Sequence, residues 1–332
     1  MNAFEWANAT SVDQAVSLLT PPATGDPDEM PRPMGGGQDL LTSMKAYIVR
    51  PPRVVNLKTI SGLNDIKFDS NTGLKIGALA TISDIEENSD IQKNFPGLAE
   101  AAESIGTLQI RNIGTLGGNL CQRPRCWYFR LENYQCLKKG GTECFSAGNE
   151  DKFNAILGGG PSFIVHPSDM APMLIALGAT VTIAGPNPAR TIPLEQFFAL
   201  PTVDVRRETI LKDGEIVTEI QVPASAMAAT STYLKFKERN SLDFALSSVA
   251  AAVDLGPDKS VRDVRLVLGG VAPIPWRVPK AEQFLTGKKL SNDVLVQAGK
   301  IALADASPMN QNGYKVPLTQ TLIRRALTKL NA

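Results

Sequence analysis

All four cysteines of this 332-residue chain lie within 24 consecutive positions, with the spacing Cys121-x4-Cys126-x9-Cys136-x7-Cys144. Buried structural thiols would be spread through a core, whereas these lie in one polar stretch rich in arginine and lysine. Two disulfides suit a short secreted domain more than a chain of this length. A site that binds metal through four thiolates is therefore the favoured interpretation.

The spacing also bears on which metal is bound. Zinc usually binds CxxC knuckles, and no pair of cysteines here has that spacing. Irregular, widely spaced thiolates suit a [4Fe–4S] cluster. Basic and aromatic neighbours could offset its negative charge and shield it from water: Arg123, Arg125, Arg130, Lys138, Lys139, Trp127, Tyr128 and Phe129. A solvated charged loop and ordinary loop packing are the alternatives for these side chains.

The composition limits the class of protein. With 43% hydrophobic residues, the chain can bury a sizeable core, and its length predicts two or three domains. Its net charge of +1 leaves no broad basic face for nucleic acid or an anionic membrane. The N-terminus lacks the pattern of a signal peptide, and the uncharged stretch 170–189 is interrupted by glycines and prolines. We expect a soluble protein without membrane insertion.

The order of expected elements favours an α+β fold. Capping residues Ser11 and Thr81 precede helical patterns, and residues 74–79 read as a strand. Residues 223–230 resemble a linker, after which strands (232–239 and 261–271) precede two closing helices (292–306 and 317–330). Helices and strands interleave too irregularly for a doubly wound sheet.

Two glycine-rich stretches indicate close approach of the backbone to a ligand. Residues 34–42 read MGGGQDLLT, and residues 109–119 read QIRNIGTLGGN. Adjacent glycines can turn several N–H groups toward one anion, such as a diphosphate. Leu40 stands where GxGxxG would need its third glycine, and no GxxxxGK[ST] occurs. A tight turn is the alternative for either stretch alone, but two such stretches in one domain favour binding.

A third motif is His166-Pro-Ser-Asp169-Met. His166 is the only histidine, which excludes HExxH metalloproteases, and the lack of GxSxG argues against a serine hydrolase. Ser168 and Asp169 fit the cap of the helix that follows. Asp169 could also accept hydrogen bonds from a ribose or ribityl hydroxyl, and the two roles are compatible.

Several motifs in a fixed order resemble one family. GGGQDLL, QIRNIGTLGGNL, HPSDM, EIVTEIQVP, Lys235-x3-Arg239 with DFALSSVAAAV, and GGVAPIPWRV-x3-E-x2-L-x-GK follow one another. Together they resemble the FAD-binding medium subunit of the xanthine dehydrogenase and molybdenum hydroxylase family. Here 46 residues separate Asn119 from His166, and this insertion holds every cysteine. It is similar to the subgroup with an extra [4Fe–4S] cluster, above all to the periplasmic-type aldehyde oxidoreductase FAD subunit.

The resemblance implies a domain arrangement. Residues 1–226 would form an FAD-binding domain like that of the p-cresol methylhydroxylase and vanillyl-alcohol oxidase group. Its two subdomains would cover about 1–57 and 58–226, with the insertion at about 120–165. Residues 227–332 would form a smaller α+β domain of the CO dehydrogenase flavoprotein type.

The resemblance also implies which residues contact each cofactor. Asp169 would hold adenosine or ribityl hydroxyls, and Lys235 near the flavin ring would stabilise its reduced anion. Ile105 stands where relatives of the eukaryotic type carry an aromatic residue, so the cover of that ring face is an open question. The implied FAD contacts are Pro33, Met34, Gly35, Gly36, Gly37, Gln38, Asp39, Leu40, Thr42, Thr107, Gly114, Thr115, Gly117, Gly118, Asn119, His166, Ser168, Asp169, Val217 and Lys235. The implied cluster ligands are Cys121, Cys126, Cys136 and Cys144.

Finally, the resemblance implies a heterotrimer that is inactive without its partners. A large molybdenum cofactor subunit would oxidise an aldehyde, a small subunit with two [2Fe–2S] clusters would relay electrons, and this chain would pass them to an external acceptor. No catalytic acid or base is expected on this chain. The alternatives are a 4-hydroxybenzoyl-CoA reductase-like or xanthine dehydrogenase-like complex, a self-contained flavoprotein oxidase, and a zinc-stapled interaction module. Both cytoplasm and periplasm are compatible with the sequence, the latter through export with a partner.

Overall fold

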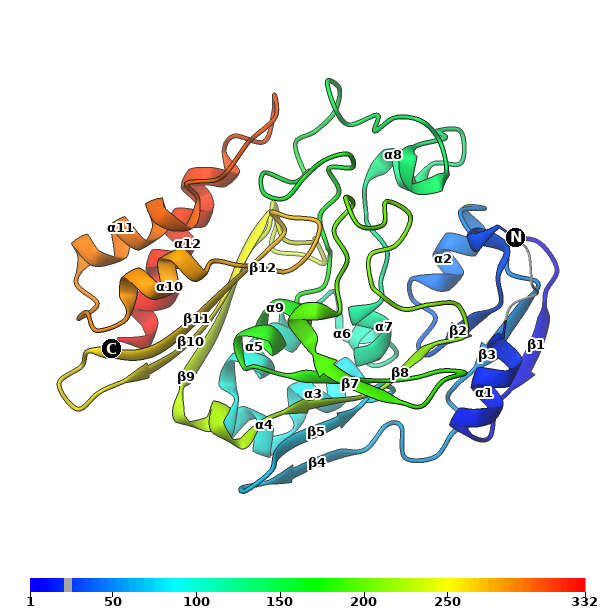
Figure 1. Ribbon diagram of the computed structural model, residues 1–332, viewed down its shortest axis with the longest axis horizontal. Helices are drawn as coiled ribbons and strands as arrows, with labels where there is room; N and C mark the ends of the chain where they lie inside the picture. Colours follow the sequence, from blue (N-terminus) through cyan, green and yellow to red (C-terminus); the bar gives the residue numbers. More distant parts are fainter. Residues whose placement is uncertain (21–25, 332) are drawn as a thin grey trace.

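The computed structural model describes residues 1–20 and 26–331 and contains three β-sheets, one in each of three successive parts of the chain (Figure 1). The mixture of helices and antiparallel and parallel strands confirms the α+β prediction. Within the described residues, no helix is both long enough and apolar enough to cross a membrane.

The first sheet is small and parallel, with strand order β1-β3-β2. Ser11 caps the helix α1 by accepting the N–H of Gln14, as the sequence predicted. The buried face of α1 packs on the sheet through Ala15 and Leu19. The elements are β1 (Glu5–Asn8), α1 (Val12–Leu19), the 3₁₀ turn η1 (Pro27–Glu29), β2 (Arg32–Met34), α2 (Leu40–Lys45) and β3 (Arg53–Asn56).

The second sheet has five antiparallel strands in the order β4-β5-β8-β6-β7. Its central strand β8 lies after the insertion in the chain, whereas β4 and β5 lie before it. The sheet therefore joins segments from both sides of the insertion. Thr81 caps α3 as predicted, and together with Asp84 it forms a capping box. The strands are β4 (Ile66–Asp69), β5 (Gly73–Gly77), β6 (Thr180–Ala184), β7 (Arg190–Pro193) and β8 (Ile216–Val222), and the helical elements are α3 (Ile82–Glu87), α4 (Ser89–Asn94), α5 (Pro96–Glu103), α6 (Leu108–Arg111), α7 (Leu116–Leu120), α9 (Met170–Ala176) and η3 (Leu194–Gln196).

The C-terminal sheet is antiparallel, in the order β12-β11-β10-β9, and three helices cover one of its faces (Figure 1). Strand β10 is buried on both faces, because α12 covers one side while α5 and α9 lie on the other. The predicted linker is a short 3₁₀ helix, η4. The elements are η4 (Ala224–Ala228), β9 (Thr230–Phe236), β10 (Ser247–Leu255), β11 (Val261–Gly269), β12 (Trp276–Arg277), α10 (Pro279–Leu285), α11 (Asn292–Ala302) and α12 (Lys315–Leu330).

The insertion crosses the top of the molecule in Figure 1 and contains little regular structure: α8 (Trp127–Arg130) and η2 (Leu137–Lys139). Its far end joins the C-terminal domain. Ile156 and Leu157 pack in the hydrophobic core under β10 and β11, and Asp151 accepts the N–H groups of Asn310 and Gln311.

One buried lysine ties this far end down. Lys315, at the start of α12, is fully buried, and its Nζ donates to the carbonyl oxygens of Phe153 (2.8 Å), Asn154 (3.0 Å) and Gly270 (2.8 Å). The first two carbonyls belong to the end of the insertion, and the third follows β11. A single ammonium group therefore satisfies three carbonyls that regular structure leaves unpaired.

We expect Lys315→Met to lower the free energy of unfolding by about 3 kcal/mol, since it leaves the carbonyl oxygens of Phe153 and Gly270 without the Lys315 donor. Urea denaturation measures this change. Lys280→Met is the control, because Lys280 pairs with Asp305 at the surface, with 69% and 70% of the two side chains exposed. Equal, small effects of both substitutions would contradict the structural role given to Lys315.

Candidate functional site

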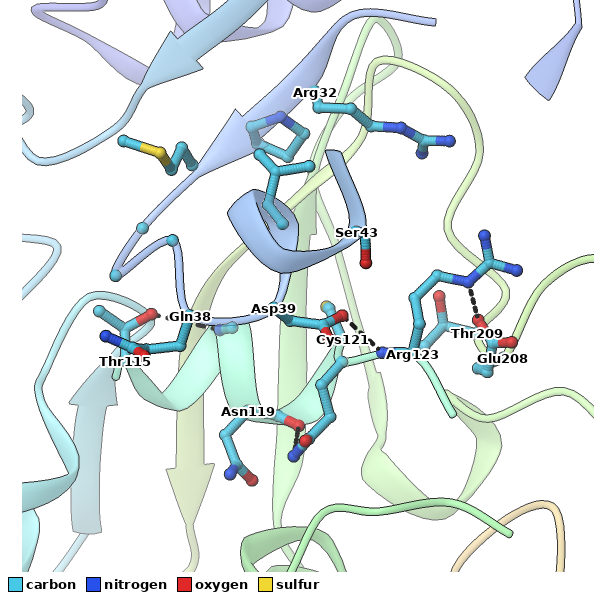
Figure 2. A pocket seen from close by; sticks show the side chains of 18 of the residues that line it. Arg32, Gln38, Asp39, Ser43, Thr115, Asn119, Cys121, Arg123, Glu208 and Thr209 are labelled. Atoms are coloured by element: carbon cyan, nitrogen blue, oxygen red, sulfur yellow. Dashed lines mark hydrogen bonds and ion pairs between the residues drawn. The ribbon is translucent and has the colours of Figure 1, made fainter. Parts of the chain in front are cut away.

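A cavity of about 400 Å³ lies where the glycine-rich stretches, residues 206–215 and the β9–β10 loop meet. Figure 2 shows its wall around the turn before α2 and the start of α7. This volume lies within the range of small-molecule and cofactor sites. Leu242 and Phe244 of the β9–β10 loop close one side, so the C-terminal domain contributes to the cavity.

The two glycine-rich stretches pack directly against each other. A Cβ on Gly36 would lie 2.0 Å from the carbonyl oxygen of Ile113, and one on Gly35 would lie 2.7 Å from the Thr115 hydroxyl. Both distances are far below van der Waals contact, so these positions require glycine. These glycines therefore let the two loops pack together and also leave the cavity open. The sequence alone could not distinguish these two roles.

Most of the predicted FAD contacts line the cavity. Those in its wall are Pro33, Met34, Gly35, Gly36, Gly37, Gln38, Asp39, Leu40, Gly114, Thr115, Gly118, Asn119, Asp169 and Lys235. Ile105 lines it too, from the position where relatives of the eukaryotic type carry an aromatic residue. The predicted contacts outside the lining are Thr42, Thr107, Gly117, His166, Ser168 and Val217.

Several residues outside the lining support those within it. The Ser168 hydroxyl donates to Asn119 Oδ1 (2.5 Å) and accepts the N–H of Ala171 (3.0 Å), so it caps α9 and also orients Asn119. Thr107 caps α6, and Thr42 donates to the Gln38 carbonyl. These side chains act on the cavity through their neighbours.

Both carboxylate oxygens of Asp169 already accept hydrogen bonds within the protein. Its Oδ1 accepts from the Tyr233 hydroxyl (2.6 Å) and its Oδ2 from Lys235 Nζ (2.8 Å), which also donates to the Ser104 carbonyl (3.0 Å). All three side chains are buried or nearly so. Burial raises the pKa of the Tyr233 hydroxyl well above its ordinary value, and the neighbouring Asp169 carboxylate raises it too. Lys235 thus lines the cavity with its charge paired.

Asp39, in the first glycine-rich stretch, holds the start of the insertion. Its carboxylate accepts the N–H of Arg123 (2.8 Å), Arg125 Nη1 (2.6 Å) and Arg130 Nη2 (2.7 Å); Figure 2 shows Asp39 facing Arg123. Burial raises the pKa of Asp39, but Arg125 and Arg130 outweigh it and leave the pKa below its usual value. We call Asp39, Arg125 and Arg130 the Asp39 clamp.

A second buried carboxylate adds to this attachment. Glu208 accepts from Arg123 Nε (2.9 Å) and lies 2.7 Å from Lys138 Nζ, which also donates to the Val205 carbonyl. The basic side chains expected to face a cluster are therefore mostly paired with carboxylates of the flavin domain. The sequence analysis considered that these side chains neutralise a cluster or lie in a solvated loop. It did not predict that they attach the insertion through ion pairs.

The cysteines do not all meet. Cys126, Cys136 and Cys144 line one small pocket, whereas Cys121 lies in the wall of the large cavity, as Figure 2 shows. Burial raises the pKa of Cys121 to about 12; it also raises that of Cys126, with a further contribution from Cys144 and Cys136. In residues 1–20 and 26–331, no group of three or more His, Cys, Asp or Glu is placed to hold a single metal ion.

The aromatic residues of the insertion divide in the same way. Tyr128 and Phe129 line the three-cysteine pocket, and Tyr128 packs with Tyr134 and Phe145. Trp127 is 66% exposed and takes no part in that lining. Two of the three aromatic residues therefore lie beside the three-cysteine pocket, and their role as a shield stays a prediction.

Comparison with known proteins identifies the family. Residues 2–225 match the family described as the FAD binding domain in molybdopterin dehydrogenase. The chain is 33% identical over 303 residues to the aldehyde oxidoreductase FAD-binding subunit PaoB of Escherichia coli (strain K12), covering 90% of this chain and 91% of PaoB. The chain belongs to the FAD-binding subunits of the molybdenum hydroxylase family.

Other relatives agree with this family membership. Residues 231–330 match the CO dehydrogenase flavoprotein C-terminal domain. The glyceraldehyde dehydrogenase medium chain of Sulfolobus acidocaldarius is 27% identical, and the match covers 98% of both chains. A chain of the reconstituted CO dehydrogenase from Oligotropha carboxidovorans superposes with a TM-score of 0.77 at 23% identity, covering 99% of this chain and 98% of that one, which shows a shared fold.

Membership of this family indicates that the chain binds FAD. The cavity lining includes polar residues that the sequence analysis did not name. Arg32 lies in the cavity wall with its Nε buried and without a hydrogen-bond partner among the described residues. Arg206 and Lys212 line it from the segment before β8. Arg32 directly precedes the predicted contacts at 33–42. This adjacency is the sequence feature from which Arg32 could have been predicted to line the cavity.

We expect Asp39→Asn to destabilise the chain by about 2 kcal/mol, since it leaves two partly buried arginines without their carboxylate. Thermal unfolding and limited proteolysis of the insertion measure the effect. Asp243→Asn is the matched control, because Asp243 pairs with the exposed Arg239 at the surface and its loss should leave the stability almost unchanged. Normal protease resistance of the Asp39 variant would show that the clamp does not hold the insertion.

The single histidine predicts a dependence of stability on pH. Burial lowers the pKa of His166 from 6.5 to about 4. The unfolded chain therefore binds a proton between these values while the folded chain does not, so stability falls as the pH drops below 6.5. Wild type should lose about 1.5 kcal/mol through this group between about pH 6.5 and about pH 5. His166→Gln should remove that loss in pH-dependent urea titrations; an unchanged slope would contradict a buried neutral imidazole.

Proposed function

We propose that this chain is the FAD- and [4Fe–4S]-binding electron-transfer subunit of a heterotrimeric molybdenum-dependent aldehyde oxidoreductase. The similarity to an aldehyde oxidoreductase FAD-binding subunit over nearly the whole chain is the observation that carries the proposal. The insertion with its cysteine-lined pocket supports the iron–sulfur part.

The cavity fits FAD by the chemistry of its wall. The paired glycine-rich stretches would hold the diphosphate, with backbone N–H groups available where side chains are absent. Bound FAD supplies storage of two electrons and their transfer onward. Asn119, oriented by Ser168, would hold the cofactor's hydroxyl groups or phosphates, and Thr115 would contribute beside it.

The pair Asp169–Lys235 would set the charge next to the cofactor. The ammonium group of Lys235 is fixed by Asp169 and the Ser104 carbonyl, so it cannot swing away from the cavity. A positive charge fixed near the flavin favours its reduced, anionic form. Because Asp169 offsets that charge and Tyr233 in turn holds Asp169, this chain would tune the reduction potential moderately.

Substrate oxidation would take place on another subunit. Every cysteine of this chain lies in the insertion, so none is left for the two [2Fe–2S] clusters of a relay subunit. We therefore expect a large molybdenum subunit, a small [2Fe–2S] subunit and an external electron acceptor as partners. The order of transfer would be from the molybdenum subunit, through the small subunit, to this chain.

Analysis of the purified chain tests the proposal. We expect a yellow-brown protein with about four irons per FAD. Cys136→Ser should lose its iron while keeping FAD, because Cys136 lies among the cysteines of the pocket and outside the FAD cavity. Zinc without iron would refute the cluster, and iron retained in the variant would remove Cys136 from the ligands.

For the whole complex, turnover of benzaldehyde but not reduction of 4-hydroxybenzoyl-CoA would support aldehyde oxidation.

A further inference from the structure

We propose that Arg111 is a positioning residue for the flavin: it fixes the end of α5, and through that end it fixes the ammonium group of Lys235 at the cavity. This inference rests on the FAD site proposed for the cavity, and it names a side chain that lies outside the lining. It follows from the hydrogen bonds that the last carbonyl oxygens of α5 and of the turn after it accept.

The end of α5 leaves three consecutive carbonyl oxygens without a backbone donor. Gly106, with a φ of +50°, turns the chain from α5 toward α6, so the helix does not continue beyond Ser104. Among the described residues, no backbone N–H donates to the carbonyl oxygens of Glu103, Ser104 and Ile105. Carbonyls at the end of a helix carry partial negative charge and need other donors, cations above all.

Arg111 supplies the donor for two of these carbonyls. It is the last residue of α6 and is 8% exposed, and its Nη1 donates to the carbonyl oxygens of Glu103 (3.2 Å) and Ile105 (3.0 Å). Glu86 of α3 binds the rest of the same guanidinium, with distances of 2.6 Å from Nε to Oε2 and 3.2 Å from Nη2 to Oε1. The planar guanidinium is therefore fixed between α3 and the turn that follows α5.

Lys235 binds the carbonyl that lies between these two. Its Nζ is 3.0 Å from the Ser104 oxygen and 2.8 Å from Asp169 Oδ2, and its side chain is 4% exposed. Because Arg111 binds the carbonyl on either side, the Ser104 oxygen cannot turn away from Lys235 without breaking those bonds. Arg111 therefore acts on the Lys235 ammonium group through the backbone of this turn.

The same turn forms part of the cavity wall. Ile105 and Gly106 line the cavity together with Ile110 of α6 and Lys235. A Cβ on Gly106 would lie 3.1 Å from Ile110 Cγ2, so the turn packs tightly on α6. Fixing the turn thus fixes both the apolar wall and the charge beside it.

A second contact of α5 keeps the strand β9 in place independently of Arg111. Glu100, one turn before Ser104, accepts the Tyr233 N–H (2.8 Å) and the Thr232 hydroxyl (2.7 Å). Loss of Arg111 would therefore loosen the contact between Ser104 and Lys235 while β9 stays aligned on α5. We expect the chain to fold and to bind FAD without Arg111, but with a less firmly placed Lys235.

The consequence lies in the reduction potential of bound FAD. A positive charge held at a fixed distance favours the reduced, anionic flavin more than one that moves away from it. Loss of Arg111 should weaken the preference for reduced over oxidised flavin about tenfold, which lowers the potential of the two-electron couple by about 30 mV.

Redox titration of the FAD-loaded chain tests this inference. The variant is Glu86→Gln with Arg111→Met, because removing both charges excludes an unpaired carboxylate as the cause of a shift. Arg277→Met with Glu282→Gln is the matched control. It removes another Arg–Glu pair, with Nε–Oε1 and Nη2–Oε2 distances of 3.1 and 2.9 Å, and neither residue lines the cavity. The control should keep the wild-type potential.

A comparison in the Lys235→Met background separates positioning from a general structural effect. Lys235→Met should itself lower the potential, and the Glu86→Gln, Arg111→Met pair should then lower it no further, because it acts through Lys235. Arg111→Lys keeps the charge but not the planar fork, so it should give a smaller shift of the same sign. If the double variant does not fold, Arg111→Lys provides the same comparison.

Two results would overturn the inference: a wild-type potential in the Arg111 variants, or an equal shift with and without Lys235. Failure of the proposed FAD site gives a different result, since it concerns chains that keep Arg111. A wild-type chain that takes up no FAD, or bound FAD whose potential is unaffected by Lys235→Met, would refute that site and the role of Arg111 with it.

Discussion

The carboxylate of Asp39 is the contact on which the arrangement of the cavity and the insertion depends. It follows the three glycines that pack on the second glycine-rich stretch, and it binds two arginines and one backbone N–H of the insertion. Because one side chain serves both parts, the turn that would face a diphosphate and the start of the cysteine segment form one unit. A shift of the glycine-rich turn would move Asp39 and, through its hydrogen bonds, the start of the insertion, and the reverse also holds.

Buried ion pairs join the insertion to the rest of the protein alongside the apolar contacts of Phe129 and Cys136. Apart from α8 and η2 it contains no helix or strand, yet Arg123, Lys138 and Glu208 join it to the flavin domain inside the protein. Replacing such pairs by apolar residues can stabilise a protein, so their presence argues less for stability than for a fixed geometry. If the insertion holds a cluster as proposed, its cysteines would need such fixed positions.

The sequence was informative wherever local chemistry decides the structure. Caps at Ser11 and Thr81 and the α+β class were confirmed, and the cavity lining contains most residues that the motifs implied. It failed where residues distant in the chain meet. Neither the pairing of Asp39 with Arg125 nor that of Asp169 with Tyr233 has a spacing that could reveal it, since 86 and 64 positions separate the partners. For the same reason, the spacing of the cysteines could not show that Cys121 follows the helix α7 and packs against a different core from Cys136.

The insertion is attached at both ends, and this bears on how a cluster there would act. Its start is held by the Asp39 clamp, and its end is held by Lys315 and by the N–H groups that bind Asp151 in the C-terminal domain. Phe244 of the C-terminal domain lies under the guanidinium of Arg125, so both domains meet the insertion at the large cavity. A cluster bound by cysteines of this segment would therefore cross-link the insertion itself, between its two points of attachment, through metal–sulfur bonds. It would keep the loop closed over the cofactor whether or not it carries electrons, because loop closure by metal ligands removes conformations from the unfolded chain.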